Sequence, residues 1–246
     1  MATYRAELHV HTVLSPCAGV EMIPPVIVEM ALAKGINLIA ITDHNVTANI
    51  GAVMKAAKGT GLTVLPGMEL QTEEEVHVLC LFDTLEQAEA WQRIVDSRFG
   101  KIPNDVEFFG EQFVVDETGD FIRREPRLLI TNVDISLEEA ADRVNALGGL
   151  IIPAHVERRA YGLMAMLEFA PPIFEAMEIS KHVSVAEACK RFPELLAFPL
   201  LQSGDVHFPD GFIGVMEFEM RVPMISEIRK AIHGEGGRSM RIVPGN

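Results

Sequence analysis

The sequence lacks the features that stabilise secreted proteins and anchor membrane proteins. Its three cysteines, Cys17, Cys80 and Cys189, are odd in number and far apart, so they do not predict the disulfide framework of a small secreted domain. No apolar run reaches the length of about 18 residues that spans a bilayer, and no apolar signal segment precedes residue 9. These absences predict a cytoplasmic protein with no membrane partner.

Basic residues are also scarce. Lys and Arg number 21 against 35 Asp and Glu, which gives a formal net charge of −14. No basic cluster is longer than Arg123-Arg124 or Arg158-Arg159, whereas a protein that binds duplex nucleic acid usually carries a basic stripe. We therefore expect no duplex nucleic acid partner. A small phosphorylated substrate is compatible with this composition.

Strand and helix patterns alternate along most of the 246 residues, of which 48% are hydrophobic. Strands are predicted over 4–11, 37–42, 62–66, 76–82, 150–153, 176–179, 199–202 and 213–217. Helices are predicted over 24–34, 46–58, 84–97, 136–147, 160–168, 184–190 and 223–233. This order predicts a single α/β domain over 1–246, built as a closed or nearly closed barrel. Residues 100–127 break the alternation and predict a β-hairpin insertion.

The pair His9 and His11 is the first candidate site. Both lie near the end of a predicted strand, where residues i and i+2 point to the same side. Two neutral imidazoles that converge in this way suit a transition metal better than a packed core. One His-x-His pair is weak evidence by itself, but the same chemistry recurs downstream.

Metal-ligand residue types recur at or near the ends of several predicted strands. They are His9, His11, Asp43, His44, Glu69, His77, His155, Asp205 and His207. In a βα barrel the strand ends meet at one mouth, where the active site lies. Six of the eight histidines are therefore predicted to share one face.

Five motifs together resemble the PHP (polymerase and histidinol phosphatase) family over nearly the whole chain. They read ELHVHT at 7–12, TDHN at 42–45, GME at 67–69, PAH at 153–155 and SGDVH at 203–207. The resemblance implies a distorted seven-stranded (βα)7 TIM-like barrel. It also implies two or three divalent metal ions, such as Zn, Mn or Fe, at the open end.

The resemblance distributes the ligands over three ions. It implies one ion held by His9, His11, Glu69 and Asp205. It implies a second ion on Glu69, His77 and His155. A third ion would lie on His44 and His207.

Two positions depart from the family pattern. Glu7 stands where Asp is usual, and we expect its carboxylate to orient a histidine. Cys17 stands where some relatives carry another metal-binding histidine. A thiolate beside two imidazoles suits zinc; the alternative is an ordinary loop cysteine in a two-metal enzyme.

The expected reaction is hydrolysis of a phosphomonoester of a small metabolite (histidinol phosphate-like, a nucleotide or a sugar phosphate) by metal-activated hydroxide. Asp43 and His207 are candidate proton donors to the leaving group, although Asp43 is equally compatible with support of a histidine. Arg158 and Arg159 follow His155 and suit a phosphate; ordinary surface charges are the alternative.

Other functions remain open. The same ions would serve an amidohydrolase-like attack on a C–N bond, and fold alone does not separate the two reactions. A nuclease that acts on a strand end is disfavoured by the acidic composition. A non-catalytic metal-binding regulatory protein is opposed by the complete ligand set. The sequence fixes neither the native metal nor the oligomeric state.

Overall fold

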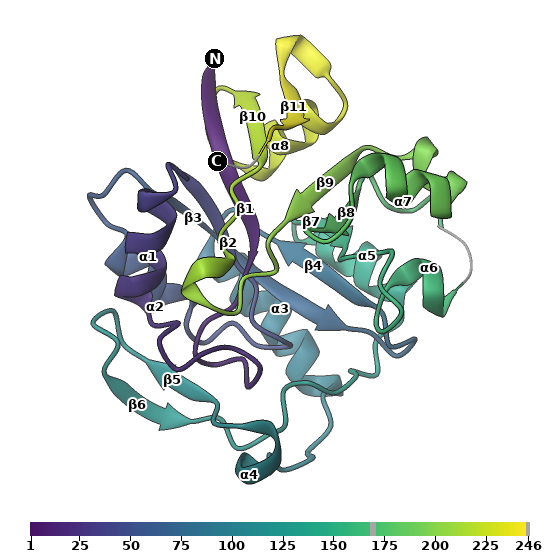
Figure 1. Ribbon diagram of the computed structural model, residues 1–246. Coiled ribbons are helices and arrows are strands. Elements are labelled where there is room, and N and C mark those ends of the chain that lie inside the picture. Colours follow the sequence, from purple (N-terminus) through teal and green to yellow (C-terminus); the bar gives the residue numbers. More distant parts are fainter. Residues whose placement is uncertain (168–170, 245–246) are drawn as a thin grey trace.

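The computed structural model describes residues 1–167 and 171–244 as an α/β fold (Figure 1). The strands are β1 (Ala2–Val10), β2 (Leu38–Ile41), β3 (Thr63–Gln71), β4 (His77–Leu81), β5 (Phe113–Val115), β6 (Phe121–Arg124), β7 (Leu150–Pro153), β8 (Met177–Ser180), β9 (Leu200–Ser203), β10 (Met216–Met220) and β11 (Ser239–Ile242). The α-helices are α1 (Pro24–Ala33), α2 (Ile50–Ala56), α3 (Leu85–Arg98), α4 (Val106–Phe109), α5 (Leu137–Ala146), α6 (Leu163–Met166), α7 (Val185–Arg191) and α8 (Ile225–Ile232). Short 3-10 turns are η1 (Pro193–Ala197), η2 (Pro209–Gly211) and η3 (Glu235–Gly237).

A seven-stranded mixed sheet forms the centre of the fold. Its strand order is β11-β10-β1-β2-β3-β4-β7. β1, β2 and β3 run parallel, whereas β4 is antiparallel to both β3 and β7. The α/β class is therefore confirmed, but a uniform βα alternation is not, because β3 and β4 form a hairpin without an intervening helix.

The sheet curls into a half-barrel, and the parallel pair β8–β9 lies across its open side (Figure 1). Two groups of backbone hydrogen bonds attach this pair. The Val156 N–H donates to the Glu178 carbonyl at 2.9 Å, next to β7. Beyond β9, the Val206 N–H donates to the His9 carbonyl at 2.9 Å, and the His11 N–H donates to the Val206 carbonyl at 2.9 Å. These bonds bring the ends of β1 and β9 together at the mouth of the half-barrel.

A β-bulge in β1 decides which way its side chains point. The pairing of β1 with β2 shifts register between Glu7 and Val10. Leu8 packs in the inner apolar cluster of the half-barrel, whereas Val10 packs in the outer cluster beneath the helices. Under strict alternation, the side chains of His9 and His11 would point away from Leu8. A bulge re-aims a strand in this way, so both imidazoles enter the mouth.

The apolar core has two layers. The inner cluster joins one face of the strands to α8 through side chains such as Leu38, Leu79 and Ile228. The outer cluster joins the other face to α1, α2, α3 and α5 and contains Trp91. Start signals in the sequence place these helices: prolines open α1, a Thr84 capping box opens α3, and Ser136 caps α5.

The 100–127 segment carries α4 and the antiparallel hairpin β5–β6, which lies at the other end of the molecule from β10, β11 and α8 (Figure 1). The Asn49 side chain ties the hairpin to the barrel, because its amide donates to the Phe113 carbonyl and its oxygen accepts from the Val115 N–H.

Some predicted boundaries differ from the structure. The strand predicted over 213–217 is β10, and the following β11 was not predicted. Of the helix predicted over 160–168, only Leu163–Met166 is helical among the described residues, and residue 168 lies outside them. Among the described residues, no helix is both long enough and apolar enough to cross a bilayer.

Glu7 fixes the loop that follows β9. Its carboxylate accepts hydrogen bonds from the backbone N–H groups of Gly204 at 2.7 Å and of Ile213 and Gly214 at 3.1 Å. Burial raises the pKa of Glu7 to about 7, although these three N–H groups favour the ionised form. The expected contact with a histidine is replaced by this loop anchor.

Glu7→Gln is expected to lower the free energy of unfolding by about 1–3 kcal/mol, because the new amide nitrogen would face backbone N–H donors inside the protein. Urea denaturation at about pH 8 measures the change. Glu29→Gln, on the exposed side of α1, is the matched control and should leave the midpoint unchanged. Equal stability of the two variants would contradict the anchoring role.

Candidate metal centre

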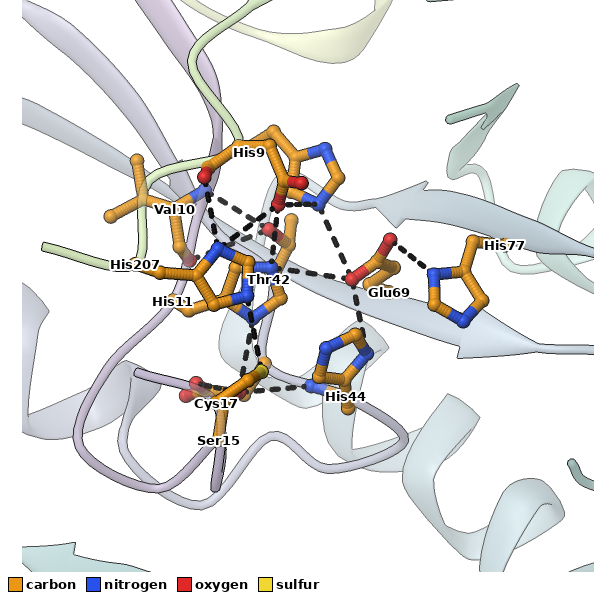
Figure 2. A network of polar contacts seen from close by, with 12 residues as sticks. His9, Val10, His11, Ser15, Cys17, Thr42, His44, Glu69, His77 and His207 are labelled. Atoms are coloured by element: carbon orange, nitrogen blue, oxygen red, sulfur yellow. Dashed lines mark hydrogen bonds and ion pairs between the residues drawn. The ribbon is translucent and has the colours of Figure 1, made fainter. Parts of the chain in front are cut away.

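The Glu69 carboxylate on β3 lies at the centre of the candidate site (Figure 2). Five imidazoles from four segments of the chain contact its two oxygens. The distances are 3.3 Å from His9 Nε2, 3.2 Å from His11 Nε2, 3.0 Å from His44 Nδ1, 2.8 Å from His77 Nδ1 and 3.1 Å from His155 Nε2. Glu69 is only 1% exposed, so its charge is balanced inside the protein.

Asp205 supplies a second carboxylate on the other side of the first two histidines. Its Oδ1 lies 3.2 Å from His9 Nε2 and 3.3 Å from His11 Nε2. Its Oδ2 accepts a hydrogen bond from Arg158 Nη1 at 2.7 Å. Two carboxylates therefore face the same pair of imidazoles.

Three sets of ligand atoms are compact enough to hold an ion, with all atoms of a set within 4.8 Å of one another. The sets are His9, His11, Glu69 and Asp205; His44, Glu69 and His77; and His11, His44 and His207. The first set is the same as the first set implied by the family resemblance. The second set contains His44 in place of His155, although His155 still contacts Glu69. The third set adds His11 to His44 and His207.

The unpartnered atoms test whether the site suits metal ions. His9 Nε2, His11 Nε2, His44 Nδ1, Glu69 Oε2 and Asp205 Oδ1 are buried and make no hydrogen bond. Buried polar atoms are normally satisfied, and imidazole and carboxylate are ligands for zinc, manganese and iron. Divalent cations at this position would satisfy all five atoms, so the donor set fits the implied metals.

The charges of the two carboxylates set the pKa values of the first two histidines. Burial alone would lower the pKa of each imidazole. The nearby Glu69 and Asp205 outweigh burial, hold the pKa of His9 well above its usual range and raise the pKa of His11 to about 9. Burial would raise the pKa of the Asp205 carboxyl, but the facing histidines hold it below its usual range.

The pKa values of three further histidines shift in the opposite direction. Burial, together with neighbouring imidazoles, lowers the pKa of His44, His77 and His207, that of His207 to about 4. These rings are neutral near pH 7, which is the form that binds a metal.

Two supporting groups that the sequence analysis missed orient the histidines. Glu178 Oε1 lies 2.9 Å from His9 Nδ1 and so aims Nε2 into the site. The Ser15 hydroxyl lies 3.0 Å from His11 Nδ1 and donates to Asp43 at 2.7 Å. An acidic residue inside the apolar strand 177–180 was the available sign for Glu178; Ser15 gave no comparable sign.

Asp43 lies behind the histidines. Its carboxylate accepts from the Thr12 N–H at 2.7 Å, the Thr12 hydroxyl at 2.8 Å and the Ser15 hydroxyl. Two adjoining hollows lie over the site, one lined by residues such as Glu69 and the other by residues such as Phe208, and Asp43 lines neither. The structure thus places Asp43 as a support for the 12–15 loop rather than beside a leaving group.

Several residues at the site have left-handed backbone conformations. The φ angles are 55° at Asn45, 32° at His155, 60° at Tyr161 and 48° at Asp205. Non-glycine residues in this region cluster at functional sites, where the surrounding structure holds the strain. The Tyr161 ring stacks on His77 with centroids 4.5 Å apart, so these turns also fix the ring of a candidate ligand.

The remaining predicted residues separate into two groups. Arg158 lines the hollow of about 190 Å³ over the cluster, together with Glu69, His155 and His207. Cys17 Sγ lies 3.1 Å from His207 Nε2. Arg159 is exposed and lines neither hollow. The structure therefore brings Arg158 and Cys17 to the site but not Arg159.

The PHP domain family model matches residues 7–116. Residues 7–116 are thus PHP-like. The matched range contains the motifs with His9, His11, His44 and Glu69 as well as His77. Three further site residues, His155, Asp205 and His207, lie beyond residue 116. They meet the matched segment through the contacts described above.

Similar proteins cover this chain to different extents. A 5′-3′ exoribonuclease from Haemophilus influenzae is 34% identical over 82 residues, 32% of this chain and 29% of that protein. The structure of the lesion-specific endonuclease PfuEndoQ from Pyrococcus furiosus is 24% identical with a TM-score of 0.72, over 97% of this chain and 58% of that chain. A protein from Bifidobacterium adolescentis, described as a metal-dependent phosphoesterase, is 19% identical with a TM-score of 0.55, over 82% and 87% of the two chains. This chain thus spans less than two thirds of the first two proteins.

The composition predicted a small phosphorylated substrate and no duplex nucleic acid partner, and this prediction is wrong. Endonuclease Q is also solved with a 27-mer duplex substrate that has an abasic lesion at the active site, and that structure covers 97% of this chain with a TM-score of 0.71. The net charge of −14 is a sum over the whole chain. It does not describe the local charge around one site, which is what a nucleic acid meets.

Zinc binding to the metal-free protein is expected to release at least one proton at about pH 7, because the pKa of His11 is raised to about 9 and a ligand imidazole must be neutral. Apparent zinc affinity should rise about tenfold per pH unit for each proton displaced, up to the pKa of His11. Isothermal titration calorimetry in buffers with different ionisation enthalpies counts the released protons.

Two variants separate this effect from general titration. His11→Asn should reduce the number of protons released, whereas His233→Asn, at the end of α8 away from the cluster, should leave it unchanged. A zinc affinity that stays constant between about pH 6 and 8 would contradict the assignment of His11 as a ligand.

Proposed function

We propose that this chain is a metal-dependent phosphodiesterase that hydrolyses nucleic-acid strands. The observation that carries the proposal is the convergence of five imidazoles and two carboxylates, in which the inward atoms of His9, His11, His44, Glu69 and Asp205 are buried and unpartnered. Several adjacent divalent ions are a recurrent means of phosphoryl transfer in nucleases and phosphatases. The PHP domain match and the similarity to metal-dependent phosphoesterases support the same reaction class.

Nucleic acid is the substrate class that the comparisons favour. Endonuclease Q structures cover 97% of this chain with TM-scores of 0.72 and 0.71, while four further similar structures have TM-scores between 0.55 and 0.58. The relative identified by sequence is named an exoribonuclease. Both names describe enzymes that cleave phosphodiester bonds.

The residues of this chain divide the work at the site. Bound divalent ions would lower the pKa of water and neutralise phosphoryl oxygens. Glu69 lies where it can bridge two ions, because its two oxygens contact different groups of histidines. Arg158 offers its guanidinium to a phosphoryl oxygen at the mouth, where it now pairs with Asp205.

We assign His207 and Asp43 to support of the ions rather than to proton transfer. The pKa of His207 is lowered to about 4, so its ring is neutral at pH 7 and is a poor acid but a good ligand. Asp43 holds Ser15, which orients His11. Its substitution should therefore weaken metal binding through His11.

Glu69→Gln is expected to lose metal and activity together, because an amide cannot supply a charged bridging oxygen. The readouts are elemental analysis of the purified protein and hydrolysis of bis(p-nitrophenyl) phosphate and a labelled oligonucleotide, with zinc or manganese. Activity should fall by about 100-fold or more. Glu73→Gln, an exposed glutamate in the β3–β4 connection, is the control. A Glu69→Gln protein that retains both metal and activity would overturn the bridging role.

The same assay tests the amidohydrolase alternative. A structure from Chromobacterium violaceum described as an amidohydrolase covers 85% of this chain with a TM-score of 0.56. p-Nitrophenyl phosphate and a panel of p-nitroanilides are therefore run beside the diesters. Cleavage of anilides without cleavage of diesters would overturn the proposed function.

We also propose that Cys17 completes a zinc site with His44 and His207. Its thiol lies 3.1 Å from His207 Nε2, although burial raises the pKa of the free thiol above its usual range. A bound zinc ion would deprotonate the thiol. Cys17→Ala should lower the zinc content by about one ion per chain, and Cys17→His should retain it.

Cys189→Ala, on α7, is the matched control for the loss of a cysteine. Zinc content is measured by elemental mass spectrometry after dialysis. Unchanged zinc in Cys17→Ala would assign Cys17 to an ordinary loop position.

A further inference from the structure

A second hollow adjoins the one above the metal-ligand cluster. Its volume is about 280 Å³, and it shares Arg158, Asp205 and His207 with the hollow of about 190 Å³. Its other wall carries Lys181 and Phe208, together with His182 and Asp210. The function proposed above gives no role to this wall.

We propose that this second hollow binds the nucleotide adjacent to the phosphate that is cleaved. Phe208 would stack on its base, and Lys181 would pair with its phosphate, next to Arg158. The inference rests on the proposed phosphodiesterase function and adds how the strand is held beside the ions. We call the hollow lined by Lys181, His182 and Phe208 the nucleotide subsite.

Phe208 supplies a stacking surface that is already exposed. Its side chain is 51% exposed at the edge of the hollow. A base that stacked on the ring would remove this apolar surface from water. Aromatic rings stack on bases of any sequence. The ring does not depend on a flexible loop for its place, because the Gly211 N–H donates to the Phe208 carbonyl at 2.8 Å.

Close packing fixes the loop that carries Phe208. A Cβ on Gly204 would lie 2.3 Å from the Gly211 carbonyl oxygen, so only glycine fits at this crossing. Glu7 accepts three backbone N–H groups of the same loop. The stacking residue and the ligands Asp205 and His207 thus belong to one anchored segment.

Lys181 supplies a cation that is not already used by a partner. In the part of the chain that the structure describes, no carboxylate lies within 4.0 Å of its ammonium group. Its backbone position is held by Gln202, whose amide donates to the carbonyls of Ser180 at 2.9 Å and Val183 at 2.8 Å. The backbone on both sides of Lys181 is therefore fixed, which keeps its side chain at the wall of the hollow.

The wall of the nucleotide subsite carries two cations and two carboxylates. Arg158 and Lys181 face it as cations, and His182 adds a ring that can donate a hydrogen bond. Asp205 is paired with Arg158 at 2.7 Å and faces the histidines. Asp210 is the remaining acidic group, and it lies on the exposed turn η2 at the rim.

Binding of a fluorescein-labelled single-stranded oligonucleotide of about 12 nucleotides tests the subsite without turnover. Fluorescence anisotropy is measured in EDTA over a range of salt concentrations. Phe208→Ala should weaken binding by about 5- to 150-fold with no change in salt dependence. Lys181→Ala should reduce the slope of log K against log salt by about 0.7, the value for one phosphate contact on a single strand.

Matched variants separate a subsite from general surface effects. Phe208→Trp and Lys181→Arg should restore binding, because they keep the ring and the charge. Phe108→Ala and Lys190→Ala remove another exposed ring and another exposed cation away from the hollow and should leave binding unchanged. With metal added, Phe208→Ala should raise KM for cleavage with little change in kcat or in metal content.

The outcomes for the subsite and for the proposed function are distinct. Binding by Phe208→Ala and Lys181→Ala that equals binding by the controls would overturn the subsite, whether or not the wild-type chain cleaves diesters. A wild-type chain that fails to bind the oligonucleotide would overturn it as well. Binding with the expected slopes, but no cleavage of any diester with zinc or manganese, would overturn the proposed function and leave the subsite in place.

Discussion

The burial of one carboxylate, Glu69, constrains the rest of this structure. An ionised carboxylate in a protein interior is costly unless opposite charge or hydrogen-bond donors surround it. Five imidazoles do so, at 2.8–3.3 Å. They come from segments between residue 9 and residue 155, so Glu69 can be satisfied only when β1, β2, β4 and β7 all present their ends at one mouth. The metal-ligand cluster and the barrel therefore require each other.

Local irregularities of the backbone aim the ligand side chains at this mouth. The bulge in β1 brings His9 and His11 inward, and the reversal of β4 brings the start of that strand, with His77, to the mouth. Left-handed conformations at His155 and Asp205 complete the ring of ligands. Regular strands alone would place some of these side chains on the outer face. Each irregularity is costly locally and is retained because the cluster gains from it.

Charge shows how a global property differs from a local one. A net charge of −14 argued against nucleic acid, yet the fold is shared with an endonuclease solved on a duplex. The two hollows bring Arg158 and Lys181 together with Glu69, Asp205 and Asp210. A polyanion meets the potential at the site, and bound divalent ions would make this potential more positive.

The sequence by itself determined the α/β class and the identity of the candidate ligands, because residue type and position at the end of an apolar strand are local properties. Strand alternation indicated that His9 and His11 share a direction, and the family resemblance placed Glu69 and Asp205 beside them. Only the tertiary structure decided that β4 runs antiparallel, that His44 rather than His155 completes a compact set with Glu69 and His77, and that Glu178 orients His9. These features depend on strand pairing and on contacts between residues as far as 169 positions apart. No local pattern specifies such contacts, because they form only when the sheet has curled and the β8–β9 pair lies across its open side.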